Sequence, residues 1–230
     1  MKVELVNENS VIVYFSDIVT PDTAETIAHA SHILRDGLAD CLLDIVPSYT
    51  SVLLSCNPRK TGLRAFTARI HELLSQSEQA SSLTVKRQQI VLPVYYGEEV
   101  ALDHAEISAH LGLPFSEVVK LHSAESYRVF AIGFAPGFAY LGNTHPAISI
   151  PRKENPRVKV PKGSVAIADR QTAVYPSRSP GGWQVIGRTP LDLFDIAKDT
   201  LSLFEMGDEV RFQSIERHTF LEMGGQLSDV

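Results

Sequence analysis

The run GFAPGFAYLG (133–142), followed by PRKENPRVKVPKGSVAIADRQTAVYPSRSPGGWQVIGRTP (151–190), decides the fold of the larger part of this chain. Eight of the thirteen prolines and six of the fourteen glycines lie between residues 134 and 190. Because proline lacks an amide donor and clashes with the preceding helical turn, no helix survives this spacing. Short extended pieces joined by rigid turns remain, so we predict a mostly β, closed or sandwich-like structure.

Regular elements are expected on both sides of this run. Apolar periodicity predicts strands over 89–95, 126–132 and 210–215, and short helices over 103–111 and 114–122.

The first eighty residues predict a smaller unit of order ββαββα. Two alternating runs, 3–6 and 11–15, precede a helix that has Thr20 as its N-cap and Pro21 at its first position and that ends at Gly37. Runs 41–46 and 49–55 predict a hairpin that turns at Pro47-Ser48. A second helix places apolar side chains on one face: Leu63, Phe66, Ile70, Leu73 and Leu74.

The polar stretch SQSEQASS (75–82) has no apolar periodicity and predicts a linker. We therefore predict an N-terminal α/β domain over 1–82, a β-barrel domain over 83–218 and a flexible tail over 219–230. The fold class expected from these patterns is α+β.

Composition limits the functional class. The net charge is −6, which argues against a general nucleic-acid binder. The opening MKVELVNENS lacks the apolar core of a signal peptide, and no later stretch approaches about 18 consecutive apolar residues. Two cysteines, Cys41 and Cys56, are too few for a structural zinc site or a disulfide framework. We therefore expect a cytoplasmic protein without a membrane span or a metal site.

Positive charge is concentrated in one segment. Residues 151–190 hold eight basic side chains against two acidic ones, in a chain that is otherwise acidic. Arginine forks bind carboxylate or phosphate, and rigid Pro/Gly backbone can approach a ligand closely. The segment therefore predicts a pre-organised pocket for a small polar anion, with a solvated basic face as the alternative.

The common catalytic motifs are missing from the sequence. The segment 137–144 has phosphate-loop spacing, but Asn143 stands where the lysine must be and Pro146 follows instead of a helix. There is no HExxH zinc motif and no GxSxG nucleophile elbow. Among the eight histidines, His122 is kept as a possible polar group of a site, although a structural hydrogen-bonding role is favoured.

The two quoted runs closely resemble the carboxyltransferase-domain C/D family. This family includes allophanate hydrolase subunit 1, KipI-like proteins and subunits of the bacterial ATP-dependent 5-oxoprolinase. The likeness extends through LPVYYG (92–97), LGLPFSEVVKLHSAESYRV (111–129) and DIVPSYTSVLL (44–54), and so covers almost the whole chain.

The resemblance implies a ferredoxin-like N-terminal domain followed by a cyclophilin-like β-barrel. It also implies an enzyme active only within a complex, in which this chain and 5-oxoprolinase subunits C and A open the 5-oxoproline lactam to L-glutamate with hydrolysis of ATP (Mg²⁺). The ATP site is expected to be shared with, or carried by, a partner subunit. Two alternatives from the same family are a KipI-type inhibitor of a histidine kinase and a carboxyl-transfer subunit of a urea carboxylase/allophanate hydrolase system.

Site residues follow from the same segments. The predicted catalytic group, which contacts phosphate or carboxylate, consists of Arg152, Arg157, Arg188 and Gln171. The predicted substrate-binding group consists of His122, Phe134, Pro136, Gly137, Tyr140, Lys162, Tyr175 and Ser179. Trp183 is expected to pack rather than to take part in chemistry.

Overall fold

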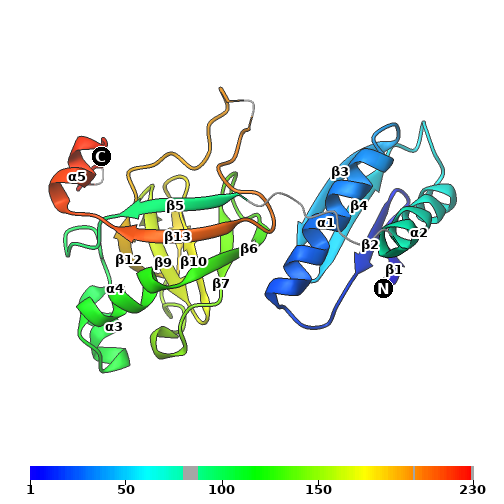
Figure 1. Ribbon diagram of the computed structural model, residues 1–230. Helices are drawn as coiled ribbons and strands as arrows, with labels where there is room; N and C mark the ends of the chain where they lie inside the picture. Colours follow the sequence, from blue (N-terminus) through cyan, green and yellow to red (C-terminus); the bar gives the residue numbers. More distant parts are fainter. Residues whose placement is uncertain (80–87, 199, 229–230) are drawn as a thin grey trace. The chain divides into compact units, whose positions relative to one another are not determined.

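A computed structural model describes residues 1–79, 88–198 and 200–228. The chain forms two compact units, residues 1–87 and 88–230. The predicted α+β class, with a small α/β unit before a β-barrel, is confirmed (Figure 1). The predicted boundary at residue 82 lies outside the described residues, and the ferredoxin-like detail stays a prediction.

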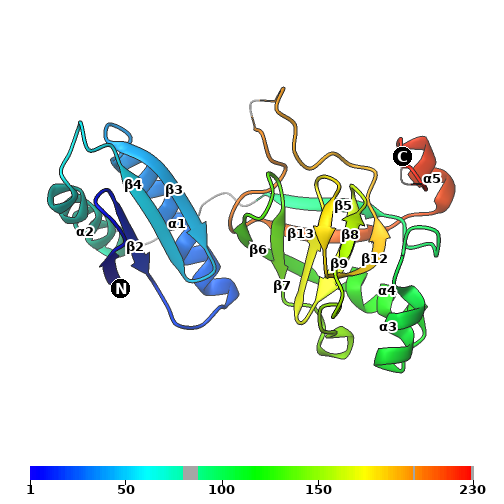
Figure 2. The ribbon, with the colours of Figure 1, turned by 180° about the vertical axis from the view of Figure 1, so that it is seen from behind.

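The N-terminal unit has the predicted ββαββα order. Its elements are β1 (Lys2–Leu5), β2 (Ser10–Tyr14), α1 (Pro21–Gly37), β3 (Leu42–Ser48), β4 (Ser51–Cys56) and α2 (Leu63–Gln79). The strands pair antiparallel in the order β1-β2-β4-β3. Both helices lie on the same face of this sheet (Figures 1 and 2).

Local chemistry explains the start of α1. Thr20 is extended and its side chain accepts a hydrogen bond from the amide of Thr23, while Pro21 opens the helix as predicted. Apolar side chains of α1 and α2 are buried in this unit, including Ile27, Leu34 and Phe66, each fully enclosed.

Two predicted boundaries in this unit are wrong. Pro47 lies inside β3, opposite Val52, and the hairpin turns at Tyr49 and Thr50 instead of at Pro47-Ser48. Tyr49 has a positive φ of 35°, so a residue without the usual turn signature makes the reversal. The predicted linker also begins too early, because 75–79 continue α2. Residues 80–82 lie outside the described part.

The second unit is a closed barrel with helices packed beside it. Its elements are β5 (Gln89–Val94), α3 (His104–Leu111), α4 (Phe115–Ala124), β6 (Ser126–Ile132), β7 (Ala139–Gly142), the 3₁₀ turn η1 (Pro146–Ile148), β8 (Arg157–Val160), β9 (Ser164–Ala168), β10 (Gln171–Val174), β11 (Ser179–Gly181), β12 (Gln184–Arg188), β13 (Glu209–Ser214) and α5 (Arg217–Glu222). The predicted helices and strands 89–95, 126–132 and 210–215 are all found, within one or two residues.

Strand pairing closes the barrel. The order runs β6-β7-β10-β9-β12, and β13 pairs antiparallel with β6 and parallel with β5. An antiparallel bridge between Tyr95, just after β5, and Arg188 of β12 joins the ends, with N···O distances of 2.9 and 2.8 Å. A separate ribbon pairs β8 with β11.

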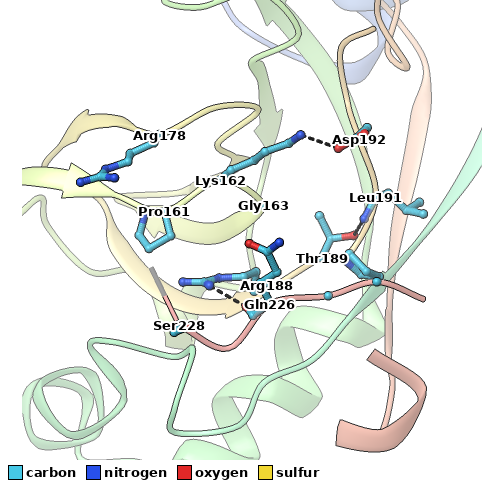
Figure 3. Close-up of a pocket in the computed structure, with 13 residues that line it drawn as sticks. Pro161, Lys162, Gly163, Arg178, Arg188, Thr189, Leu191, Asp192, Gln226 and Ser228 are labelled. Carbon is cyan, nitrogen blue, oxygen red and sulfur yellow. Dashed lines mark hydrogen bonds and ion pairs between the residues drawn. The ribbon is translucent and has the colours of Figure 1, made fainter. Parts of the chain in front are cut away.

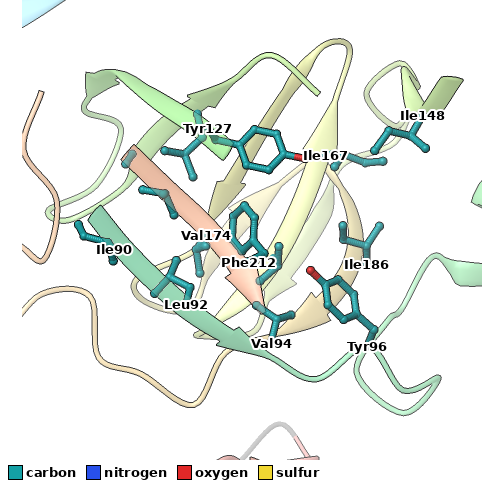
Figure 4. Close-up of a cluster of buried hydrophobic side chains, with 14 of the residues drawn as sticks. Ile90, Leu92, Val94, Tyr96, Tyr127, Ile148, Ile167, Val174, Ile186 and Phe212 are labelled. Carbon is teal, nitrogen blue, oxygen red and sulfur yellow. The ribbon is translucent and has the colours of Figure 1, made fainter. Parts of the chain in front are cut away.

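Alternate residues of the barrel strands face two different layers. Val165 and Ile167 of β9 point into the main core, whereas Ala166 and Ala168 of the same strand belong to a second cluster on the other face. The main core is filled by branched and aromatic side chains such as Ile90, Leu92, Tyr127 and Phe212 (Figure 4). Both faces of β9 are therefore buried.

The C-terminal segment differs from the predicted flexible tail over 219–230. Helix α5 includes residues 219–222, and Phe220 is fully buried with its ring 5.5 Å from that of Tyr95. The carbonyl of Gln226 accepts a hydrogen bond from Arg188 at 2.7 Å. The described part of this segment is held against the barrel because Phe220 supplies an apolar anchor that the sequence pattern does not reveal.

Among the described residues, no helix combines the length and apolar character needed to cross a bilayer.

Candidate functional site

Five aromatic rings form a layer on the outer face of the barrel strands. We call this layer the aromatic face, and it consists of Phe134, Phe138, Tyr140, Tyr175 and Trp183. Phe138 is central, with ring centroids 5.3 Å from Tyr175 and 6.0 Å from Trp183. These edge-to-face contacts form a rigid apolar floor.

The glycine- and proline-rich loop 133–138 shapes one edge of this floor. Phe134 and Gly137 both have positive φ, 73° and 81°, and the Phe138 amide donates to the Ala135 carbonyl at 3.0 Å. A Cβ on Gly137 would lie 2.8 Å from the Cβ of Phe194, so only glycine fits. Phe134 is 64% exposed and Pro136 is exposed, as pocket-wall residues would be.

Arg152 is placed beside the aromatic face. Its guanidinium carbon lies 5.6 Å from the centre of the Trp183 ring, a cation–π contact, while Trp183 is 5% exposed. Tyr175 is 1% exposed, and its pKa is raised mainly by burial. Arg152 is therefore an oriented cation above an apolar floor.

Arg157 has a different role from the one predicted, because Asp103 occupies its fork. Both terminal nitrogens of Arg157 donate to the Asp103 carboxylate at 2.7 Å, and Lys153 Nζ donates at 2.9 Å. The Val185 amide adds a fourth hydrogen bond at 2.7 Å. We call this arrangement the Asp103 cluster, and in it Arg157 ties three segments of the barrel unit together instead of facing a ligand.

A second group of cations lines a cavity of about 220 Å³ (Figure 3). We call it the cationic pocket, and it is lined by Pro161, Lys162, Gly163, Arg178, Arg188, Thr189, Pro190, Leu191, Asp192, Gly224, Gly225, Gln226 and Ser228. Lys162 pairs with Asp192 at 2.5 Å, and Arg188 donates to the Gln226 carbonyl at 2.7 Å. Three basic side chains and one acidic one leave the pocket with positive charge.

The absence of a side chain at Gly163 allows two backbone segments of the cationic pocket to pack in contact. Its φ is 78°, and a Cβ there would lie 2.4 Å from the Thr189 carbonyl oxygen. The Gly163 carbonyl accepts from the Thr189 amide at 2.9 Å. The backbone that carries Lys162 and the backbone that follows Arg188 therefore touch directly.

The prediction that His122 binds substrate is wrong, because His122 lies in the main core with no exposed surface. Thr172 donates its hydroxyl to the Ala166 carbonyl, so the same oxygen accepts from His122 Nε2 at 2.8 Å. His122 Nδ1 then accepts from the Tyr96 hydroxyl at 2.9 Å. Burial lowers the pKa of His122 from 6.5 to about 3, so the ring is neutral and structural.

The remaining predicted residues occupy ladder positions. Gln171 begins β10 opposite Gly142 and Ala168, and Ser179 begins β11 opposite Val160. The predicted single site is therefore divided. Arg152, Phe134, Gly137, Tyr140 and Tyr175 gather at the aromatic face, while Lys162 and Arg188 gather in the cationic pocket.

Sequence reasoning misses Asp103 of the Asp103 cluster, Arg178 of the cationic pocket and the buried Gln184. Asp103 pairs with residues 50 and 54 positions later, a contact that no local spacing announces. Arg178 counts toward the basic segment, but nothing in its local sequence assigns it a role. Gln184 lies in the run SPGGWQVIGRTP (179–190), where the glycines are the evident sequence signal and nothing marks the glutamine as buried.

Comparisons with known proteins agree with this architecture. The model of the family described as carboxyltransferase domain, subdomain C and D, matches residues 1–204. The chain is 37% identical over 209 residues to the B subunit of 5-oxoprolinase from Escherichia coli O157:H7, covering 90% of this chain and 93% of that protein. The solved structure of TTHA0988 superposes with a TM-score of 0.78 at 32% identity, covering 90% of this chain. This chain spans 40% of the TTHA0988 chain.

A more distant likeness concerns the fold alone. The urea carboxylase of Kluyveromyces lactis superposes with a TM-score of 0.72 at 16% identity, covering 96% of this chain and 22% of that one.

Proposed function

Because the chain belongs to the family of carboxyltransferase domain, subdomains C and D, we propose that it is the B subunit of a 5-oxoprolinase. The observation that carries the proposal is the 37% identity to the B subunit of a 5-oxoprolinase over nearly the full length of both chains. The proposed reaction opens the lactam of 5-oxoproline to L-glutamate with hydrolysis of ATP, in a complex with subunits C and A.

The chemistry requires binding of anions. A lactam is too stable to open readily with water, so phosphorylation of its carbonyl oxygen by ATP would create a species that water hydrolyses. Negative charge develops on oxygen in both steps, and fixed cationic groups stabilise it. A member of this complex is therefore expected to present oriented arginine and lysine side chains.

The cationic pocket supports this role for one anionic group. Lys162, Arg178 and Arg188 line a cavity of about 220 Å³, which is smaller than the roughly 300 Å³ at which pockets for whole organic ligands begin. The pocket suits a phosphoryl group or a carboxylate, and a complete nucleotide needs further surface.

The described residues do not by themselves offer a magnesium site. No three His, Cys, Asp or Glu side chains among them gather in a way that suits a metal ion. We therefore propose that one of the two partner subunits completes the site for ATP and Mg²⁺, and that this chain contributes cationic contacts to the anionic end of the nucleotide or of the product.

Reconstitution tests the proposed function. ADP release that depends on 5-oxoproline is measured with this chain alone, with the C subunit added, and with both the C and A subunits added. Activity only in the three-chain mixture is the expected result. A full mixture without activity, together with binding of this chain to a histidine kinase, would replace the proposal with the regulatory alternative.

Substitution tests the cationic pocket within that complex. Arg178→Gln is an exposed change that removes one cation, and we expect it to lower turnover about tenfold, the usual loss for one charge-assisted contact. Arg211→Gln, an exposed substitution on β13, is the matched control. Equal turnover of both variants would show that the cationic pocket takes no part in the reaction. The proposed identity of the protein would not be affected by that result.

A further inference from the structure

A short segment that follows α5 forms one side of the cationic pocket. We call residues 224–228 the C-terminal strap, and four of them line the pocket: Gly224, Gly225, Gln226 and Ser228. The carbonyl of Gln226 accepts a hydrogen bond from Nη1 of Arg188 at 2.7 Å (Figure 3). The strap therefore contacts a cation of the pocket through a neutral acceptor.

One residue, Tyr95, holds both the base of the strap and its target. The backbone of Tyr95 exchanges two hydrogen bonds with that of Arg188, at 2.9 and 2.8 Å. The Tyr95 ring lies 5.5 Å from that of Phe220 in α5. Glu99 accepts from the Tyr95 hydroxyl at 2.9 Å and from Arg217 of α5 at 2.7 Å. Because α5 and Arg188 are fixed to the same residue, the strap begins at a defined position beside the pocket.

The strap itself is held less firmly than its base. Gln226 and Ser228 are exposed and Leu227 is half-buried, so little apolar surface leaves water when the strap closes. The Gly225 amide donates to a carbonyl of α5 at 2.9 Å, and the residues beyond it extend over the pocket. A segment with few buried contacts opens at a low cost in free energy.

The strap presents an acceptor to the pocket, whereas an anion needs donors. The amides of Gly224 and Gly225 already donate to carbonyls of α5. The Gln226 carbonyl occupies a donor of Arg188 that an anion in the pocket would use. A guanidinium forms stronger hydrogen bonds with a charged carboxylate or phosphate oxygen than with a neutral carbonyl. The strap and an anion therefore compete for Arg188.

We propose that the C-terminal strap is an autoinhibitory segment, which occupies Arg188 until an anion displaces it from the cationic pocket. The anionic ligand rests on the proposed function, whereas the closed state rests on the contacts of the strap. Closure lowers the apparent affinity for the anion in proportion to the fraction of molecules that are open. One hydrogen bond from a charged donor, with few other contacts, corresponds to an effect of about tenfold.

Calorimetric titration with inorganic phosphate at constant ionic strength tests the proposal. It compares the full chain with a shortened chain that ends at Gly225, which keeps α5 but lacks the carbonyl that Arg188 contacts. We expect the shortened chain to bind phosphate about tenfold more tightly. Arg178→Gln in the shortened chain is expected to cancel most of this gain, which would assign the bound phosphate to the cationic pocket.

A point substitution moves the strap without shortening the chain. A Cβ on Gly225 would lie 2.5 Å from the ring of Phe220, which is fully buried, so Gly225→Ala should displace the strap and raise the affinity for phosphate. Gly62→Ala in the N-terminal unit is the matched control, because an added Cβ there meets nothing within 4 Å. The control should bind phosphate as the full chain does. This pair of variants carries the test if the shortened chain fails to fold.

The outcomes separate the strap from the proposed function. Equal or weaker binding of phosphate by the shortened chain, or by Gly225→Ala where the shortened chain does not fold, would overturn the autoinhibitory role even if the complex turns over. Absence of phosphate binding by every chain would overturn it as well, because the strap would then have no anion to exclude. Tighter binding by the shortened chain, together with a three-chain mixture that releases no ADP, would sustain the strap and overturn the enzymatic proposal.

Discussion

Replacing Asp103 by asparagine should unfold the barrel unit at markedly lower temperature. The Asp103 side chain is 1% exposed and accepts hydrogen bonds from Arg157, Lys153 and the Val185 amide. An asparagine at this position would keep the shape but lose the charge, and its amide nitrogen would face donors. Arg157 would then be a largely buried cation that has lost its carboxylate partner, and Lys153 would retain only Glu106.

The size of the loss follows from burial. Breaking a buried ion pair by removing one partner costs about 3–5 kcal/mol, and the retained amide oxygen puts Asp103→Asn near about 3 kcal/mol. In a unit of this size that lowers Tm by roughly 10 °C.

Burial alone raises the pKa of Asp103, but hydrogen bonds from Arg157 and Lys153 outweigh it and hold the pKa below 3.8. The carboxylate therefore stabilises the fold above pH 3.8, and its contribution is lost as pH falls through the folded pKa.

Thermal unfolding followed by circular dichroism between about pH 3 and pH 8 measures the decrease in Tm and its dependence on pH. The control is Glu117→Gln, which breaks an exposed pair with Lys120 at 3.3 Å and should change stability by less than about 0.5 kcal/mol. The difference between wild type and Asp103→Asn should narrow at the acidic end. A Tm change for Asp103→Asn no larger than that of the control would refute the stabilising role of the Asp103 cluster.

Three further predictions concern single positions. Burial lowers the pKa of the His122 ring from 6.5 to about 3, so the ring should show no titration by NMR between about pH 5 and 8. Because only the unfolded chain binds a proton at His122 in this range, the folded state should lose stability as pH falls below 6.5, by up to about 1.4 kcal/mol per pH unit. A ring that titrates near pH 6.5 would contradict this assignment. Gly163→Ala should destabilise the barrel unit by about 2 kcal/mol in urea unfolding, because its φ is 78° and the new Cβ would meet the Thr189 carbonyl; an unchanged urea midpoint would argue against that contact. Thr20→Ala should lower the stability of the N-terminal unit by about 1 kcal/mol through loss of its cap, whereas Thr20→Ser should not.

Local patterns predict the elements well where one face is buried. The strand 126–132 is predicted to the residue because its sequence is a short apolar run rich in aromatic and β-branched residues, and the start of α1 is predicted by its threonine cap and proline. The predicted hairpin turn is misplaced because proline usually ends strands. Here Pro47 lies within β3, and Tyr49 adopts the positive φ at the turn. The polar end of α2 escapes prediction because helix propensity continues where apolar periodicity stops.

Side-chain pairing over long sequence separations limits prediction of the site. Composition reveals the basic segment, but whether each arginine faces solvent or a carboxylate depends on residues far away in the chain. Arg157 is engaged by Asp103 from 54 positions earlier, whereas Arg152 in the same motif stands over Trp183. His122 carries no local sign of burial, since its partners come from other parts of the barrel unit. Composition thus predicts the chemistry of the region, and tertiary pairing decides which residues are available to a ligand.

The most direct test of the proposed function is the amount of L-glutamate formed from 5-oxoproline, measured together with ADP release, by subunits A and C with and without this chain. We expect the two products to appear in equal amounts when all three chains are present and both to disappear when this chain is omitted. Formation of L-glutamate at the same rate by subunits A and C alone would contradict the proposal.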